Sequence, residues 1–286
     1  MKRLIVNADD FGLCASVNRG VLEAHRDGIV TSATLLANAP GFEEAVALAR
    51  LARGLGVGVH LNLTRGPALT RPAAVPSLVR GDGLFAHTPR TLALAILRRR
   101  VALDEVRREW EAQIARVRDA GITPTHLDSE KHVHLHPALL RVAIGLARAH
   151  GIGAVRAGAE PGLLARLAPA NPQWYKCSVL GVLGRRARRL VGAAGQKTAD
   201  RVLGVLDGGR LDADRLGRLL GRVGDGVTEL ICHPGYDSPE LRRLVAASGG
   251  GYLLAAREPE VRALTAPGLR QALRERGIAL IHYGEL

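Results

Sequence analysis

The chain contains few of the residues on which several classes of protein depend. Aromatic residues make up 3% of its 286 residues, and it has three cysteines, Cys14, Cys177 and Cys232. Base stacking on single-stranded nucleic acid needs several exposed aromatic rings, so we expect no nucleic-acid partner. Three widely spaced cysteines suggest neither a disulfide framework nor a zinc ribbon, and they favour a reducing, cytoplasmic setting.

Long hydrophobic runs are also absent. No apolar stretch reaches the roughly 18 residues that a membrane-spanning helix needs. The apolar run Leu4–Val6 is too short for a signal peptide. The composition, 47% hydrophobic and 23% charged, is that of a soluble globular protein with a sizeable core.

Lysine is scarce, whereas arginine is abundant. Four lysines and 36 arginines contribute to a net charge of +13, and arginines cluster at Arg98–Arg100 and Arg185–Arg189. Such clusters can attract nucleic acid, anionic lipid or an acidic substrate. A compositional bias spread over a solvated surface explains them equally simply, so the charge alone assigns no partner.

Short apolar runs alternate with helical patterns along the chain. Strands are expected at about residues 4–8, 29–37, 56–63, 123–129, 152–156, 227–232 and 278–282. Helices are expected at about residues 16–27, 43–53, 103–120, 137–150, 211–223, 238–248, 258–263 and 267–276. This alternation predicts a parallel sheet covered by helices, and about seven such units predict a distorted (β/α) TIM-like barrel.

Two stretches interrupt the alternation. Residues 65–90 are rich in proline, glycine and arginine, and residues 158–210 contain Trp174, Tyr175 and the second arginine cluster. Long loops in a compact domain are usually functional or disordered. We therefore expect a single domain over residues 1–286 with these two insertions, the second of which forms a lid over the active site.

Two adjacent carboxylates, Asp9 and Asp10, end the first expected strand. In parallel α/β proteins the loops at the carboxyl ends of strands carry the chemistry. Successive side chains on a strand diverge, which suits a pair in which one carboxylate binds a metal and the other handles a proton. An isolated pair could equally cap the next helix, so its significance depends on the other strand ends.

Further polar residues gather at those strand ends. His60 and Asn62 share one face of the third expected strand, and His233 follows the sixth. The densest segment is Thr125–Pro137, which holds four of the ten histidines together with two carboxylates. Imidazole and carboxylate ligands suit a divalent ion such as Zn, Mn, Fe or Ni, or Mg where carboxylates dominate. We expect one such metal ion at this edge of the sheet.

Together these segments resemble the YdjC/ChbG-like carbohydrate deacetylases, a family that includes the hopanoid-associated HpnK type. The matching motifs follow the family's order over nearly the whole chain, and they are Asn7–Gly12, Gly28–Ser32, Gly58–Leu61, Thr125–Ser129, Cys232–Gly235 and Ala263–Gly277. The resemblance implies a distorted (β/α) barrel, a divalent metal ion, and hydrolysis of an N-acetyl group from an amino sugar.

The resemblance also implies roles for individual residues of this chain. Asp10 and His60 are expected to be metal ligands, and Asp9 is expected to be the general base. His233 is expected to be the general acid that protonates the departing amine, although a histidine in a turn can also be purely structural. Arg156 corresponds to an arginine on the substrate side of the family's site.

The chain departs from the family at one position. The family commonly has a histidine directly after the Asp-Ser pair, where this chain has Glu130. Either Glu130 is the third ligand, in an Asp/His/Glu site, or His132 reaches the metal and Glu130 supports it; we favour Glu130. Asn62, Asp128 and Tyr236 are further candidates for contact with substrate.

Three functions are compatible with these features. The leading hypothesis is metal-dependent removal of an N-acetyl group from an acetylated amino sugar, in an oligosaccharide or a glycolipid. The alternatives are a metal-dependent hydrolase of another bond, such as a phosphoester, and a basic protein that binds nucleic acid or anionic membrane. For the leading hypothesis, lipid linkage of the sugar, peripheral contact with the inner membrane face and a homodimer are left open.

Overall fold

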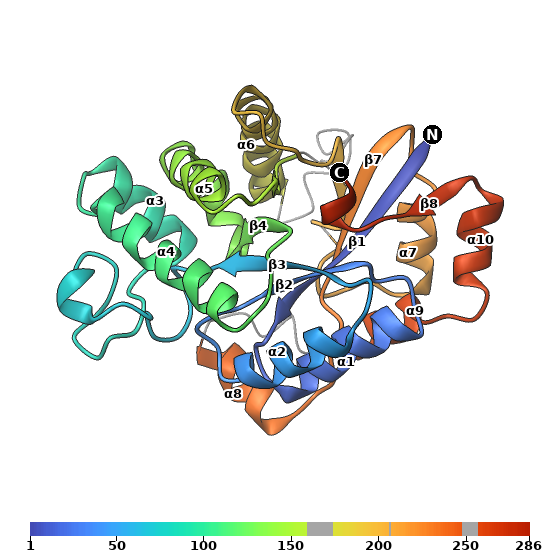
Figure 1. Cartoon of the computed structure of the whole chain (residues 1–286), viewed down its shortest axis with the longest axis horizontal. Helices are drawn as coiled ribbons and strands as arrows, with labels where there is room; N and C mark the ends of the chain where they lie inside the picture. The colour runs from blue at the N-terminus through green and yellow to red at the C-terminus, as the bar shows by residue number, and fades with distance from the viewer. Residues whose placement is uncertain (159–173, 206, 248–256) are drawn as a thin grey trace.

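The computed structural model describes residues 1–158, 174–205, 207–247 and 257–286, with only the backbone for 174–179. Within these residues, eight parallel strands form one sheet that is surrounded by helices (Figure 1). The strands are β1 (Lys2–Phe11), β2 (Ser32–Leu35), β3 (Gly56–Leu61), β4 (His126–Ser129), β5 (Ala154–Val155), β6 (Arg201–Leu203), β7 (Gly226–Cys232) and β8 (Ile278–Leu280).

The sheet has the order β5-β4-β3-β2-β1-β7-β6, and β8 pairs with the beginning of β1. Its two edges are joined by an isolated bridge between Ala154 of β5 and Lys197, which precedes β6. The Val155 amide donates to the Lys197 carbonyl at 3.1 Å, and the Lys197 amide donates to the Gly153 carbonyl at 3.0 Å. The expected distorted (β/α) barrel is thereby confirmed.

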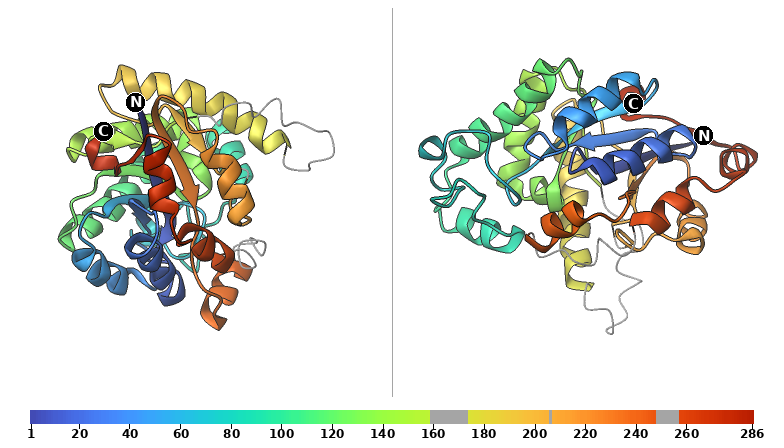
Figure 2. Two further views of the ribbon diagram at one scale, coloured as in Figure 1. Left: turned by 90° about the vertical axis from the view of Figure 1, so that its right-hand side faces the viewer. Right: turned by 90° about the horizontal axis from the view of Figure 1, so that it is seen from below.

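Helices pack around the outside of the curled sheet (Figure 2). They are α1 (Ala15–Arg26), α2 (Phe42–Leu51), α3 (Pro89–Leu97), α4 (Leu103–Asp119), α5 (Pro137–Ala149), α6 (Trp174–Ala193), α7 (Ala213–Leu220), α8 (Pro239–Ala247), α9 (Arg257–Leu264) and α10 (Leu269–Glu275). Neighbours along the ring contact one another: α1 packs against α2 and α9, α4 against α5, and α5 against α6.

Strand β1 separates two hydrophobic regions because its side chains alternate between the two faces of the sheet. Leu4, Val6 and Ala8 belong to the large cluster beneath the helices. Ile5 belongs to a small cluster inside the barrel, which also contains Tyr283. Further along the same inward face the side chains become polar, and this change places carboxylates in the interior at the carboxyl end of the strand.

Of the two expected insertions, the second differs from the prediction in extent. Residues 65–90 leave the sheet and are held by antiparallel bridges between Pro67 and Leu84 and between Val79 and Phe85. The range 158–210 contains β6, which belongs to the sheet, so it is not an insertion throughout. Residues 159–173 of the expected lid lie outside the described residues, as do the side chains of Trp174 and Tyr175.

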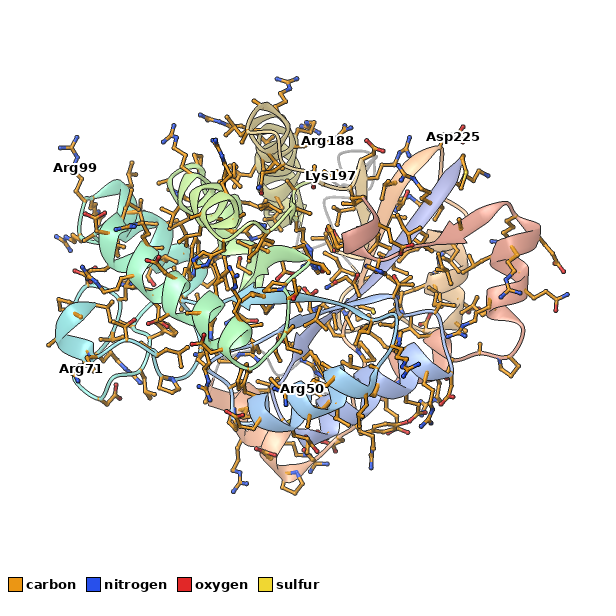
Figure 3. The ribbon with its side chains drawn as sticks, viewed as in Figure 1. Arg50, Arg71, Arg99, Arg188, Lys197 and Asp225 are labelled. Carbon is orange, nitrogen blue, oxygen red and sulfur yellow. The ribbon has the colours of Figure 1, made fainter. Side chains whose placement is uncertain are left out.

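Arginine side chains project from the outside of the molecule in several directions. Arg50, Arg71, Arg99 and Arg188, which are all exposed, lie on different elements around its periphery (Figure 3). The two arginine clusters also lie on separate parts of the molecule, since Arg98–Arg100 directly follows α3 and Arg185–Arg189 lies on α6. In the described parts of the chain, no helix combines the length and apolar character that crossing a bilayer requires.

Candidate active site

Five polar side chains gather at the carboxyl ends of β1, β3 and β4. They belong to Asp9, Asp10, His60, Asp128 and Glu130, and none of these residues is more than 4% exposed. The parallel register brings them together, because β1, β2, β3 and β4 are consecutive neighbours in the sheet and His60 lies directly opposite Asp128. Buried charges at this density must be compensated by nearby groups. The five side chains form two clusters of three, which share His60.

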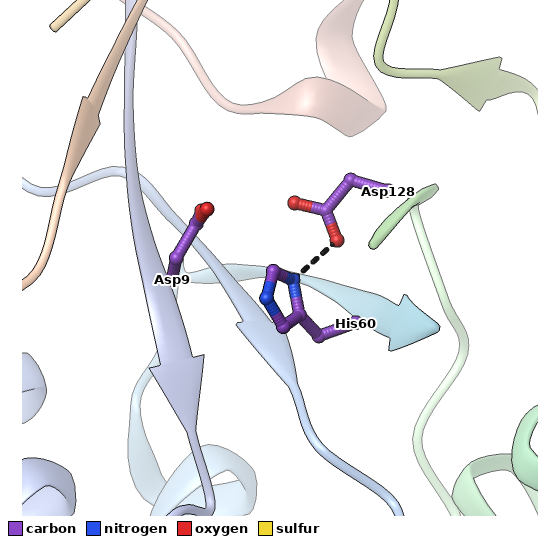
Figure 4. Close-up of side chains that lie close together, drawn as sticks. All are labelled: Asp9, His60 and Asp128. Atoms are coloured by element: carbon purple, nitrogen blue, oxygen red, sulfur yellow. Dashed lines mark hydrogen bonds and ion pairs between the residues drawn. The ribbon is translucent and has the colours of Figure 1, made fainter. Parts of the chain in front are cut away.

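Each cluster could hold a metal ion by its arrangement of ligand atoms. One consists of Asp10, His60 and Glu130, and the other of Asp9, His60 and Asp128 (Figure 4). Within each, one ligand atom per residue lies within 4.8 Å of the others. The first cluster is the predicted ligand set with Glu130 in third place.

Arg156 distinguishes the two clusters. Its guanidinium donates to both carboxylate oxygens of Asp9, at 2.9 and 2.7 Å, and lies 2.5 Å from Asp128. It also lies 2.7 Å from Glu229, whose other oxygen accepts the Tyr283 hydroxyl at 2.6 Å. Arg156 and the His60 ring contact all four carboxylate oxygens of the second cluster. In the first cluster, Arg257 and Arg65 closely contact one oxygen each of Asp10 and Glu130, so each carboxylate keeps an oxygen for a metal ion and this cluster fits one better.

Asp9 stays ionised despite its burial. Burial by itself would raise the pKa of this carboxyl, but the charge of Arg156 and its hydrogen bonds hold the pKa well below the ordinary value. The Asn7 side-chain amide donates to Asp9 at 2.9 Å and adds to this fixation. An ionised carboxylate can accept a proton, although the lowered pKa makes Asp9 a weak base.

Asp10 follows Asp9 directly, so a regular strand would direct its side chain to the opposite face, toward the helices. The side chain of Asp10 instead joins the same cluster. Its φ angle of 66° is left-handed, and the register with β2 shifts between Ala8 and Phe11. Its carboxylate pairs with Arg257 and lies 3.8 Å from Arg65. Burial opposes ionisation, but these two arginines hold the pKa of Asp10 well below its usual range.

His60 and Glu130 complete the first cluster from two other strand ends. The His60 Nδ1 atom lies 2.7 Å from Asp128, and its Nε2 atom lies 3.5 Å from Glu130. Burial would lower the pKa of His60, but Asp128 raises it well above the ordinary value. A carboxylate on Nδ1 fixes the ring and leaves Nε2 for a ligand, which is a common arrangement at metal sites. Arg65 holds the other oxygen of Glu130 at 2.8 Å.

His132, the alternative third ligand, belongs to neither cluster among the described residues. The chain turns at Lys131 and His132, whose φ angles of 53° and 56° are left-handed. The chain is therefore not extended beyond Glu130, and His132 and His134 do not continue the alternation of β4. His134 instead enters the interior, where it contacts the Ser129 hydroxyl at 2.6 Å and the Arg156 carbonyl at 2.9 Å.

His233 follows β7 and is partly exposed. Its charge contributes to the lowered pKa values of Asp9 and Asp10, as expected of a neighbour at the same edge of the barrel. The Pro-Gly sequence after it has a structural reason. A Cβ atom at Gly235 would lie 3.3 Å from the Val17 side chain of α1, and one at Gly20 would lie 2.5 Å from the Gly235 Cα.

The remaining predicted residues lie around this centre. Arg156 is buried among carboxylates, as described above. Asn62 uses its side-chain oxygen to accept the amides of Thr64 and Arg65, and its nitrogen donates to Asn38 and the Arg65 carbonyl, so it shapes the turn that carries Arg65. Tyr236 donates to Glu23 of α1 at 2.7 Å. Contact of these residues with substrate stays a prediction.

Sequence reasoning missed several residues of the site. Arg65 lies four residues after the end of β3, so its position at a strand exit was a usable signal. Arg257, by contrast, reaches Asp10 from α9 and is one of 36 arginines. Glu229 and Tyr283 extend the network below Arg156, and neither belongs to a recognisable motif.

Similar proteins include curated relatives that match nearly all of this chain. A carbohydrate deacetylase of Geobacillus stearothermophilus is 39% identical over 98% of this chain and 96% of its own length. A carbohydrate deacetylase of Mus musculus is 35% identical over 99% and 94%. A chitooligosaccharide deacetylase of Serratia marcescens is 33% identical over 100% and 99%.

A solved structure and a family profile also match nearly the whole chain. The crystal structure of an Enterococcus faecalis protein, described as a candidate cellobiose-phosphate cleavage protein, matches with a TM-score of 0.78 and 32% identity. The match covers 99% of this chain and 98% of that chain. The sequence profile of the YdjC-like proteins matches residues 3–275. The motifs, the barrel and the relatives therefore lead to one conclusion: this chain belongs to the YdjC-like protein family.

Proposed function

We propose that this protein is a metal-dependent deacetylase that hydrolyses the N-acetyl group of an acetylated amino sugar. The observation that carries the proposal is the convergence of Asp10, His60 and Glu130 beside the ionised Asp9. The names of the curated relatives, carbohydrate deacetylase and chitooligosaccharide deacetylase, support the reaction and the substrate class.

The donor set of the first cluster fits a divalent ion. Asp10 and Glu130 offer carboxylate oxygens and His60 offers Nε2, a combination that Zn, Mn, Fe and Ni accept and that Mg accepts in part. A bound cation supplies Lewis-acid polarisation of the acetyl carbonyl and makes a water molecule more acidic. Arg65 and Arg257 hold the outer sides of the two carboxylates and keep both ionised.

The protein's own residues then handle the protons. Asp9 accepts a proton from the attacking water, because it is ionised at neutral pH and lies beside the cluster. The low pKa of Asp9 makes it a weak base, so its contribution to the rate depends on its fixed position beside the attacking water. His233 donates a proton to the amine nitrogen as the C–N bond breaks, since an amine does not leave as an anion.

The decisive experiment measures acetate release from N-acetylated chitooligosaccharides. We expect release by the purified protein, its loss after treatment with a chelator, and its return when Mn²⁺ or Zn²⁺ is added. Asp9→Asn should lower the rate about a hundredfold or more while metal binding persists. Full activity in Asp9→Asn would remove the assignment of the base.

A phosphoester hydrolase is supported less well. That reaction would draw on arginines that face a substrate phosphate, whereas Arg65 and Arg257 contact the carboxylates of Glu130 and Asp10. The identity of the sugar, its attachment to a lipid, contact of the arginine-rich α6 with a membrane, a cytoplasmic location and a homodimer stay predictions of the sequence.

A further inference from the structure

Helix α9 contributes two fully buried charged residues, Arg257 and Glu260, to the edge of the barrel where the candidate active site lies. They are three residues apart and therefore share one face of the helix. Burying two long charged side chains on one helix is costly unless both are paired. Each of them is paired, Arg257 with the carboxyl end of β1 and Glu260 with the segment that follows β7.

Arg257 holds the carboxyl end of β1, where Asp10 lies. Its guanidinium donates to the Asp10 carboxylate, and its side chain passes close to the turn after His233. A Cβ atom at Gly235 of that turn would lie 3.2 Å from the Arg257 Cδ. Asp10 has a left-handed backbone, so its carboxylate direction is not set by the strand, and Arg257 is a partner that can set it.

Glu260 holds the loop that follows β7. One of its oxygens accepts the His233 amide at 2.5 Å, and the other accepts the Gly209 amide at 2.9 Å. A Cβ atom at Gly208 would lie 3.2 Å from the His233 ring, so the segment held by Glu260 packs against the imidazole. Glu260 thus fixes both the backbone of His233 and the segment that packs against its imidazole ring.

Helix α9 is itself fixed to the barrel at its carboxyl end. Val261 and Leu264 are buried, and the Ile29 amide donates to the Leu264 carbonyl at 3.2 Å. Gly28 permits this approach, because a Cβ atom there would lie 2.4 Å from the Leu264 oxygen. A helix anchored in this way can hold these two segments at a constant separation.

We propose that Arg257 and Glu260 are positioning residues, through which α9 orients the metal ligand Asp10 and the acid His233 separately. The inference rests on the proposed function for the roles of Asp10 and His233. The competing explanation is that both residues only stabilise the fold, in which case replacing either one would affect metal binding and turnover together.

The first measurement addresses Arg257 and does not depend on activity. Calorimetric titration of Mn²⁺ into the metal-free protein gives the metal affinity of wild type, R257K and R257Q. Loss of a residue that orients a ligand typically lowers metal affinity about 10- to 100-fold, and we expect that loss in both variants. Unchanged or tighter binding would overturn the inference, because removal of a merely repulsive charge in R257Q should tighten binding.

The second measurement addresses Glu260. In E260Q one of the two acceptor oxygens is replaced by an amide nitrogen, so hydrogen exchange of the His233 and Gly209 amides should accelerate in the metal-free protein. We expect kcat to fall at least tenfold while KM and Mn²⁺ affinity stay within twofold of wild type. E258Q is the matched control, since Glu258 lies on the same helix in an exposed pair with Arg262.

The two arms separate the possible outcomes. If R257K weakens metal binding and E260Q lowers kcat alone, the proposal holds. If both variants change both quantities equally, or behave like E258Q, it is overturned. A wild type that releases no acetate contradicts the proposed function instead, while the metal titration and the amide exchange still decide whether Arg257 and Glu260 orient these segments.

Discussion

Arg156 is the residue on which the buried charges inside the barrel depend. It contacts Asp9, Asp128 and Glu229, and all four residues are at most 3% exposed. Burial raises the pKa of Glu229 even in the presence of this guanidinium. A substrate-side role for Arg156 stays a prediction of the sequence, and in the structure its guanidinium is a counter-ion for Asp9.

We expect Arg156→Met to destabilise the metal-free protein. Removing one partner of a buried ion pair costs about 3–5 kcal/mol, since the remaining charges lose their compensation. Urea unfolding of the two proteins measures the difference, and Arg141→Met, at an exposed arginine on α5, is the control. If Arg156 served mainly to contact substrate, its variant would retain wild-type stability and show a raised KM.

At the scale of elements, the segment between β4 and α5 shows why the sequence located the site but not its geometry. The alternating histidines would share one face only in an extended chain, but the segment Glu130–Leu135 is a 3-10 turn with two left-handed residues. Glu130 therefore stays beside Asp10 and His60 while His134 turns inward. Periodicity describes regular strands, and it gives no information on a turn that begins at the strand's last residue.

The buried His134 makes stability depend on pH. Burial lowers its pKa to about 4, below the roughly 6.5 of an unfolded histidine. Between these values the unfolded chain binds more protons than the folded one, so stability is fully present above about pH 6.5 and declines as the pH falls toward 4.

His134→Gln tests this dependence. The variant should lose part of the decline in unfolding free energy between pH 6.5 and 4, on the order of 3 kcal/mol for His134. Urea unfolding at several pH values measures it. His126, which burial shifts to a pKa of about 3, is present in both proteins and cancels in the comparison. Parallel curves for the two proteins would show that His134 makes no such contribution.

At the scale of the whole molecule, the proposed metal would join three strand ends that are far apart in sequence. A ligand that binds only the folded state stabilises it by about 2.7 kcal/mol at a concentration of 100 times Kd. We expect Mn²⁺ to raise the Tm by about 4–5 °C for a chain of this size, and a chelator to reverse the shift. Asp10→Asn should abolish the shift; an equal shift in that variant would place the ion elsewhere.

The barrel and the family were predictable because strand and helix periodicities and the motifs are local patterns. The meeting of Asp10, His60 and Glu130 was predictable because parallel strands end at one edge. Strand β6 was missed because three residues show no periodicity. Arg257 was missed because its partner, Asp10, lies 247 residues away, and nothing in the surrounding sequence marks that pairing.

The contact between Gly20 and Gly235 has a consequence for the barrel as a whole. Helix α1, which follows the two aspartates, meets the turn after His233 through backbone atoms, since a Cβ atom on Gly20 would fall 2.5 Å from the Gly235 Cα. The gap between the two sides of the site is thus set by the van der Waals radii of main-chain atoms. Contacts between side chains can adjust by a change of rotamer, but the distance between these two backbone segments cannot adjust in this way.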